Sequence, residues 1–357
     1  MWIKFCKLNL YDMQLHGRLY LIEGLRSILM LLIFLEHYPD SPIKLGGFAV
    51  CFFFMLSGFT LSYGYQDKIL SGIIGYKDFI VGRVLKIYIL HWFLLPIGFY
   101  IHRDTWMYTS KYVVANFLLL QSWIPNHYSY YSGNGVSWFL STLLFCYIIY
   151  PYLIRKLATL SIKADIVVCI FFFLLRIVLE HMISQNQSTN WLYISPFIRW
   201  LDFSIGILVY RFYQQLGKEV FNYNIGGRRY RMPLYWLFAL CLFALAFPFS
   251  KTCLWWALFF IVIKLLLHLE DYIAEICFSN RIFDVISLFG KISFTFYLIH
   301  QVYILILYNH LPVNQINSEI VKFVIILFSC IIISYVVYLY IEQPIYRKLK
   351  SFLYSHL

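Results

Sequence analysis

Long apolar runs constrain the fold of this sequence more than any other feature. A helix needs about 20 predominantly apolar residues to cross the hydrocarbon core of a bilayer. Segments between the runs are too short for an independent core, which takes at least about 40 residues. We therefore expect an all-α polytopic membrane protein in which residues 1–357 form a single integral membrane domain, with no separate soluble domain. The ten expected spanning helices are residues 21–38, 47–65, 79–101, 136–154, 165–184, 194–210, 233–249, 252–268, 284–307 and 320–341.

Basic residues are distributed unevenly between the two sides of this topology. With the N-terminus inside, the inner segments carry 17 Lys and Arg and the outer segments carry four. Cytoplasmic loops show this enrichment, so we expect both termini to be cytoplasmic. The apolar run 113–123 is too short to span, and we expect it to lie at the interface or to re-enter the membrane. The net charge of +12 is then explained by contact with the bilayer, without nucleic acid as a partner.

Cysteines and the N-terminal segment exclude several other classes of protein. The eight cysteines show no Cys-x-x-Cys spacing, which indicates neither a disulfide framework nor a zinc site. Residues 1–20 lack an apolar core followed by a small-residue cleavage site, so we expect no removable signal peptide. The most polar connection, Gln214 to Arg231, is either a mobile inner loop or a basic anchor of the topology, and the sequence favours the anchor.

Ionisable residues within the spans are where chemistry is expected, because a charge at the bilayer centre costs a few kcal/mol. The first span contains Arg26 near its inner end and His37 near its outer end. Their separation of 11 positions corresponds to about three helical turns, so both side chains project from roughly the same face and one ligand can touch both. Glu36 points about 100° away from His37 and is given no catalytic role.

Other charged residues of the spans favour structural roles. Arg176 and Glu180 are four positions apart and are expected to neutralise each other. Arg199 and Asp202 are three positions apart and form either the same kind of pair or part of a cavity wall. Glu342, followed closely by Pro344, is expected to end the last span at the cytoplasmic face.

Five short segments, in the same order, resemble the membrane acyltransferase-3 family. The first ends in Arg26 and places His37 after ten intervening residues, which is similar to the family's Arg-x10-His signature. The five segments are distributed between residues 21 and 344, so the resemblance spans nearly the whole chain. They are Leu21-Ile-Glu-Gly-Leu-Arg26, Phe52-Phe-Phe-Met-Leu-Ser57-Gly58-Phe59, Arg83-Val-Leu-Lys86-Ile-Tyr88, Gly290-Lys-Ile-Ser293-Phe-Thr-Phe-Tyr297-Leu-Ile-His300 and Ile341-Glu342-Gln-Pro344.

This resemblance implies transfer of an acyl group, usually acetyl from acetyl-CoA, to a sugar hydroxyl of a surface glycan or its lipid-linked precursor. His37 and Arg26 are our candidate catalytic residues, and His37 is the candidate for the base that removes the hydroxyl proton. Arg26, Arg83 and Lys86 are our candidates for binding acyl-CoA, since they lie toward the cytoplasmic ends of their spans. Lys86 replaces a second arginine of the family pattern, so a bidentate phosphate contact becomes a point charge. The expected location is the plasma membrane, with glycan-assembly proteins as candidate partners.

Acceptor binding is assigned to four residues. Trp138 and Ser141 belong to a Trp-x-Leu-Ser element, although the glutamate that often follows it in the family is missing. His300 completes the Leu-Ile-His element, where either packing or a polar contact with the cavity explains it. Tyr131 lies in an aromatic outer stretch, which suits a sugar ring but is also typical of the membrane interface. Ser57, next to Gly58, is read as a site of close helix packing and not as a nucleophile.

A transporter of polysaccharide or lipid-linked sugar is the alternative function. Ten spans with buried charges suit a transporter as well as an enzyme. Transporters usually contain two related halves, whereas here the functional candidates are concentrated in the first third of the chain. The sequence therefore favours the enzyme.

Overall fold

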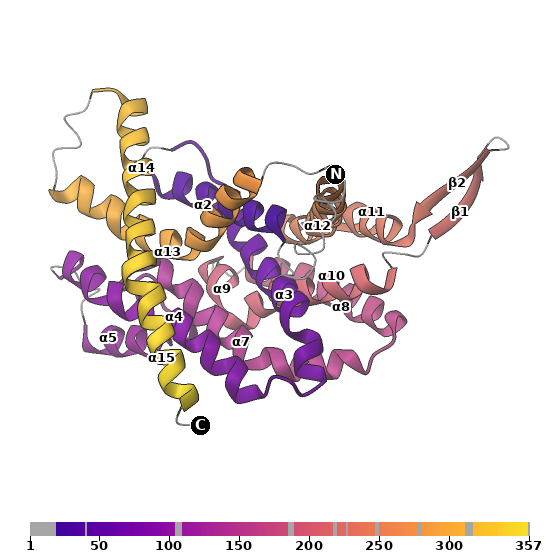
Figure 1. Ribbon diagram of the computed structural model, residues 1–357, viewed down its shortest axis with the longest axis horizontal. Coiled ribbons are helices and arrows are strands. Elements are labelled where there is room, and N and C mark those ends of the chain that lie inside the picture. Colours follow the sequence, from indigo (N-terminus) through magenta and orange to yellow (C-terminus); the bar gives the residue numbers. More distant parts are fainter. Residues whose placement is uncertain are drawn as a thin grey trace, which may run out of the picture.

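The computed structural model describes residues 19–39, 41–103, 109–184, 189–216, 220–225, 228–246, 250–276, 280–310 and 317–355. These residues form a helical bundle with one projecting hairpin (Figure 1). The longer helices are α2 (Tyr20–His37), α3 (Gly46–Leu70), α4 (Tyr76–Ile101), α7 (Trp138–Ala158), α8 (Ile162–Ser184), α10 (Pro196–Leu216), α11 (Leu234–Ala246), α12 (Lys251–Ile276), α13 (Asn280–His310) and α14 (Glu319–Val337). The shorter elements are α5 (Ser110–Phe117), η1 (Gln121–Trp123), α6 (His127–Tyr130), η2 (Gly135–Ser137), α9 (Thr189–Ile194), the π-helix η4 (Tyr338–Glu342) and α15 (Gln343–Ser355).

Within the described ranges, seven helical runs are long and apolar enough to cross a membrane. Helices α2 and α10 are not among them because each carries three charged residues, and α11 has only 13 residues. The helical membrane architecture is thus confirmed, while ten spans and the orientation of the termini stay predictions. The seven runs are Gly46–Leu70, Tyr76–Ile101, Gly135–Ala158, Ile162–Ile183, Lys251–Glu270, Asp284–Tyr308 and Glu319–Leu353.

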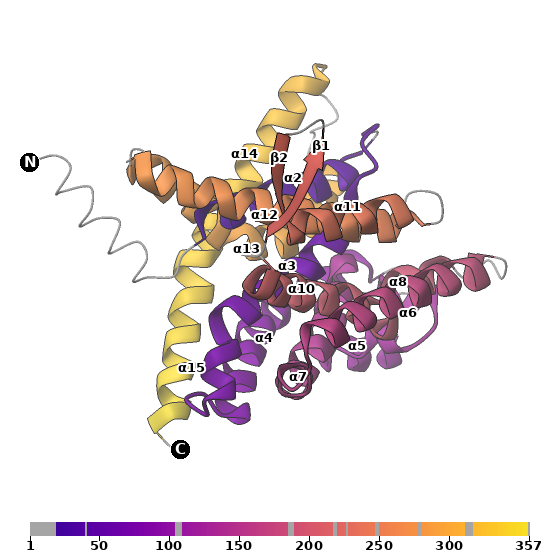
Figure 2. The same cartoon turned by 90° about the vertical axis from the view of Figure 1, so that its right-hand side faces the viewer.

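A two-stranded hairpin occupies the connection that the sequence left open as a mobile loop or a basic anchor. Strand β1 (Val220–Ile225) pairs antiparallel with β2 (Arg228–Pro233), with Ile225 opposite Arg228. The hairpin projects from the bundle beside α11 (Figures 1 and 2). Strand β1 is rich in aromatic and β-branched residues, and two glycines separate the strands in the sequence, which is typical of a tight hairpin turn. The rest of the described chain is helical as predicted, with this hairpin as a local correction.

Helices α3 and α10 pack backbone to backbone at the centre of the bundle. A methyl group added at Gly58 would lie 2.0 Å from the carbonyl oxygen of Phe203. A methyl group added at Gly206 would lie 1.9 Å from the carbonyl oxygen of Met55. Only glycine allows this approach, which confirms the close-packing interpretation of Gly58.

The run 113–123 does not form one continuous helix. Helix α5 ends at Phe117, Leu119 adopts a left-handed conformation with φ 55°, and η1 follows. Two hydroxyls tie this segment to neighbouring helix α7: Ser141 Oγ donates to the Leu119 carbonyl at 2.6 Å, and Ser122 Oγ donates to the Trp138 carbonyl at 2.7 Å. The segment is therefore not a span, as predicted.

The last predicted span does not end at Glu342. Helix α14 continues through η4 into α15, and the three form one long rod at the side of the bundle (Figure 1). The backbone N–H of Gln343 donates to the carbonyl of Tyr338, which is the five-residue spacing of a π-turn. Pro344 lacks an N–H and normally breaks a helix. The wider turn directly before it accommodates the proline without ending the helix, which corrects the prediction.

Candidate functional site

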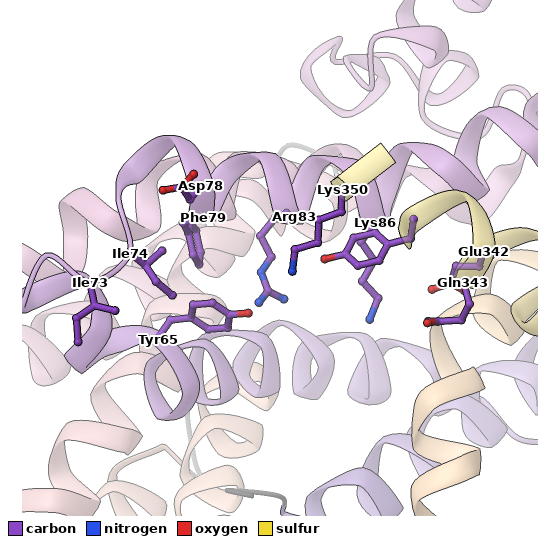
Figure 3. Close-up of a pocket in the computed structure, with 12 residues that line it drawn as sticks. Tyr65, Ile73, Ile74, Asp78, Phe79, Arg83, Lys86, Glu342, Gln343 and Lys350 are labelled. Atoms are coloured by element: carbon purple, nitrogen blue, oxygen red, sulfur yellow. The ribbon is translucent and has the colours of Figure 1, made fainter. Parts of the chain in front are cut away.

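A basic cavity of about 450 Å³ opens between α3, α4 and α15. Figure 3 shows Arg83 and Lys86 extending from α4 into this space, with Tyr65 across from them and Glu342 at one side. One turn of helix separates the two cations, so their head groups reach the same region. We call this space the inner cavity. Its lining residues are Tyr65, Ile73, Ile74, Asp78, Phe79, Gly82, Arg83, Lys86, Glu342, Gln343, Tyr346 and Lys350.

Contacts around the two cations keep them extended. The Arg83 guanidinium lies 4.5 Å from the centre of the Tyr65 ring, a favourable cation–π distance. Lys86 is exposed where it lines the cavity. Glu342 is buried and accepts a hydrogen bond from Thr295 Oγ1. The carboxylate attracts the nearby Lys86 ammonium.

A second cavity, of about 130 Å³, adjoins the first, and we call it the deeper cavity. Arg83 and Lys86 line both cavities, so they stand where the two meet. Arg26 lines the deeper cavity and donates through Nη2 to Thr60 Oγ1 at 2.8 Å. The walls beyond these cations are mostly apolar and aromatic. They comprise Phe53, Ser57, Thr60, Leu61, Ile87, Phe139, Leu143, Tyr147, Ser293, Phe294 and Tyr297.

His37, at the C-terminal end of α2, faces His300 of α13. The two ring centres are 5.0 Å apart, and Nε2 of His300 lies 3.4 Å from Nδ1 of His37. Each Nδ1 also lies close to a backbone carbonyl: that of His37 is 2.9 Å from the Ile33 oxygen, and that of His300 is 2.6 Å from the Tyr297 oxygen. A carbonyl only accepts, so both Nδ1 atoms carry hydrogen in the neutral rings. Nε2 of His37 therefore keeps a free lone pair.

Arg26 and His37 lie in two different parts of the site. His37 lines neither cavity, whereas Arg26 lines the deeper one. Tyr297 connects the two parts, because its ring forms a wall of the deeper cavity and its carbonyl holds His300. Its hydroxyl donates to the Val136 carbonyl at 2.9 Å, which fixes the ring in place. That one ligand touches both Arg26 and His37 stays a prediction.

The structure gives three of the predicted acceptor residues partners within the protein. Ser141 is buried, and its hydroxyl donates a hydrogen bond to the Leu119 carbonyl. Trp138 is buried with its ring 5.0 Å from that of Tyr193. Tyr131 is half-buried, and its ring lies 5.0 Å from that of His127. None of these three lines either cavity. Phe139 and Leu143, which belong to α7 together with Trp138 and Ser141, line the deeper cavity.

Several cavity residues were not expected from the sequence. Glu342 was expected to end the last span, and Tyr346 and Lys350 of α15 lie beyond that expected end. Their place in the wall depends on the helix continuing past Pro344. Tyr147, one turn or so before the proline of α7, also lines the deeper cavity. No sequence signal marked it among 31 tyrosines.

Metal-binding clusters of three or more His, Cys, Asp or Glu are absent from the part of the chain that the structure describes. The polar side chains of the site are its cations and hydroxyls, the carboxyl groups of Asp78 and Glu342, the amide of Gln343 and two imidazoles.

Comparison with known proteins identifies the family. The profile described as an acyltransferase domain, Acyl_transf_3, matches residues 19–339. The chain belongs to the acyltransferase-3 family. A curated relative, Acyltransferase MdmB from Streptomyces mycarofaciens, is 28% identical over 224 residues. This match covers 54% of the present chain, which spans about half the length of the relative (57%). No solved structure matches the chain.

The seven apolar helical runs agree with the expectation that this member of the family is a membrane protein. The family match contains the predicted site residues: Arg26, His37, Arg83, Lys86 and His300 lie between its limits. Only α15 and the end of η4 fall beyond residue 339, so the part of the inner cavity formed by Glu342 and α15 is outside the matched region.

Proposed function

We propose that this acyltransferase transfers acetyl from acetyl-CoA to a sugar hydroxyl of a cell-surface glycan or its lipid-linked precursor. The observation that carries the proposal is a pair of adjoining cavities that share Arg83 and Lys86, of which the second has mostly apolar and aromatic walls. Coenzyme A has the same division, with phosphates at one end and an uncharged pantetheine arm leading to the thioester. In this proposal, Arg83 and Lys86 make charge-assisted hydrogen bonds to the phosphates of coenzyme A, and the pantetheine arm extends into the deeper cavity.

The proposed topology brings each substrate to the correct side. Ten spans with both termini cytoplasmic put the inner cavity at the cytoplasmic face, where acyl-CoA is present. His37 ends α2 at the opposite side, where a glycan carried on the outer leaflet is accessible. The plasma membrane is the proposed location. Glycan-assembly proteins are the proposed partners, because they deliver such acceptors.

His37 acts as the base in the proposed reaction. Its free Nε2 takes the proton from the attacking hydroxyl while the oxygen forms the new ester bond to the acyl carbon. The carbon–sulfur bond breaks, and coenzyme A leaves as a thiolate that takes up a proton. Nδ1–H stays on the Ile33 carbonyl, and the lone pair of His300 Nε2 faces the imidazolium that forms. His300 is thus a positioning residue in this proposal.

Arg26 takes the role of orienting the acyl donor. Its guanidinium lies past Arg83 and Lys86 in the deeper cavity, where the carbonyl groups of the pantetheine arm pass. Thr60, which itself donates to the Leu56 carbonyl at 2.7 Å, holds one guanidinium nitrogen by its oxygen. The remaining donors of Arg26 are available for the arm.

Radiolabelled acetyl transfer by the purified protein in lipid nanodiscs tests the function. The protein is supplied with [14C]acetyl-CoA and p-nitrophenyl glycosides, and label that mild alkali releases from the glycoside is the measured ester. Ester formation that depends on the protein supports the enzyme. Movement of a glycoside across the bilayer without any ester would instead identify a transporter, the alternative function. In cells, loss of an ester from a surface glycan when the chain is removed identifies the natural acceptor.

A further inference from the structure

A third cavity, of about 620 Å³, opens between α8, α9, α12 and the start of α3. This volume lies within the range of about 300–1,000 Å³ that is typical of small-molecule sites. Two partly exposed aromatic rings, Tyr193 and Trp255, form part of its wall. We call this space the outer cavity, because under the proposed topology it lies at the end of the bundle opposite the inner cavity.

Charged groups of the outer cavity include one unused donor. Arg176 is 4% exposed and donates through Nε to Glu180 at 2.9 Å and through Nη2 to Thr252 at 3.2 Å. Its third nitrogen, Nη1, has no hydrogen-bond partner among the described residues. A buried guanidinium nitrogen without an acceptor is costly, so an oxygen of a ligand would complete its contacts.

The lining carries more positive than negative charge. Arg176, Arg199 and Lys251 line the cavity, against Glu180 alone. Arg199 is neutralised by Asp202 at 2.7 Å, one of the two roles that the sequence left open for this pair, and Glu180 is held by Arg176 and by Ser250 at 2.6 Å. Once these pairs are formed, Lys251 remains as the surplus charge. The outer cavity therefore favours an anion over a cation or a neutral molecule.

The two rings are held in fixed positions. Tyr193 packs against Trp138, 5.0 Å between ring centres, and its carbonyl accepts a hydrogen bond from Arg199 Nε. Trp255 lies edge-on to Phe48 at 5.8 Å. Flat, pre-positioned aromatic faces beside hydrogen-bonding groups suit the apolar face of a sugar ring. Trp138, expected from the sequence to bind the acceptor, therefore supports a wall of the outer cavity from behind.

The outer cavity adjoins the segment that carries His37. Glu36, the residue before His37, accepts a hydrogen bond from the backbone N–H of Gly46. The next residue, Gly47, lines the cavity, and a methyl group added there would lie 3.7 Å from both Tyr193 and Trp255. A ligand on the two rings is thus separated from the His37 segment by one short loop.

From these contacts we propose that the outer cavity binds the acyl acceptor and selects a sugar that carries an acidic group, either a carboxylate or a phosphate. The sugar ring stacks on Tyr193 and Trp255, and the anionic group takes the free nitrogen of Arg176 and the charge of Lys251. This inference rests on the proposed function for the identity of the ligand as acceptor.

Calorimetric titration of the purified protein tests the site directly. The probes are p-nitrophenyl β-D-glucuronide, p-nitrophenyl β-D-glucoside and glucose 1-phosphate, which separate carboxylate, neutral and phosphate ligands. We expect the two acidic probes, or one of them, to bind about tenfold more tightly than the glucoside, since a hydrogen bond to a charged group is worth about 1.5–3 kcal/mol. Equal affinity for all three overturns the acidic selectivity.

Variants of the cavity walls show which groups hold the ligand. Trp255→Ala is expected to weaken binding of the preferred probe at least about tenfold, because it removes a stacking face. Arg176→Lys is expected to reduce the preference for acidic probes. Phe171→Ala, an exposed aromatic of α8 outside the cavity, is the matched control. Unchanged affinity in a folded Trp255→Ala protein refutes the site.

The acetyl-transfer assay distinguishes failure of this inference from failure of the proposed function. If the glycosides are acetylated but Trp255→Ala leaves the acceptor KM unchanged, the enzyme stands and the outer cavity is not its acceptor site. If Trp255→Ala abolishes binding but the normal protein forms no ester, the cavity is a sugar site and the proposed reaction is wrong.

Discussion

Replacing Lys86 with methionine is predicted to weaken binding of coenzyme A while sparing binding of its phosphate-free arm. Methionine keeps most of the length of the side chain and removes its charge. A hydrogen bond to a charged group contributes about 1.5–3 kcal/mol. Because the Lys86 side chain is accessible to solvent, we expect the lower end of this range, which is roughly a tenfold increase in Kd.

The assay compares two ligands against two variants. Calorimetry measures the Kd of coenzyme A and of pantetheine, which lacks all the phosphates, for the protein in detergent. Lys77→Met is the matched control, since Lys77 is exposed at the start of the same helix and lines neither cavity. We expect Lys86→Met to weaken coenzyme A alone and Lys77→Met to change neither ligand.

The dependence of coenzyme A affinity on ionic strength tests the same contact in a second way. The difference between normal protein and Lys86→Met in affinity for coenzyme A is expected to shrink as ionic strength rises. The reasoning is refuted if Lys86→Met weakens pantetheine as much as coenzyme A, because the lysine then shapes the cavity and does not bind phosphate. It is also refuted if Lys77→Met has the same effect as Lys86→Met.

Three further substitutions test the packing and the site. Gly206→Ala is expected to lower the free energy of unfolding by about 1–3 kcal/mol, as measured by thermal unfolding. Gly64→Ala is the control, because Gly64 has open space around it, and this change is expected to be near neutral. Ser141→Ala is expected to cost about 1–3 kcal/mol of stability, because it leaves the Leu119 carbonyl without its donor; an unchanged melting temperature contradicts this. His300→Phe is expected to lower kcat at constant KM for acetyl-CoA, and a change in KM alone argues against its positioning role.

Helix positions could be predicted from the sequence because the apolar runs match the thickness of a bilayer. The seven confirmed candidates for spans coincide with predicted runs. The ion pairs Arg176–Glu180 and Arg199–Asp202 also followed from spacing, since residues three or four apart on a helix are neighbours. The meeting of Arg26, Arg83 and Lys86 around one cavity agrees with their shared depth in the predicted topology.

Features that depend on tertiary context were not predictable in the same way. Pro344 is normally a helix breaker, and only the π-turn before it lets α15 continue and carry Tyr346 to the inner cavity. The contact between His37 and His300 joins residues 263 positions apart, and nothing local to either histidine encodes it. The short strands near Gly226 are too few in residues to stand out from a polar loop.

Acetyl transfer by His37→Gln tests the central claim most directly. Glutamine retains a polar side chain of similar reach but cannot accept a proton at neutral pH. With [14C]acetyl-CoA and p-nitrophenyl β-D-glucuronide, we predict that this variant binds acetyl-CoA with normal affinity and forms no labelled ester, while His268→Gln behaves as the normal protein does. Ester formation by His37→Gln at the normal rate would contradict the account.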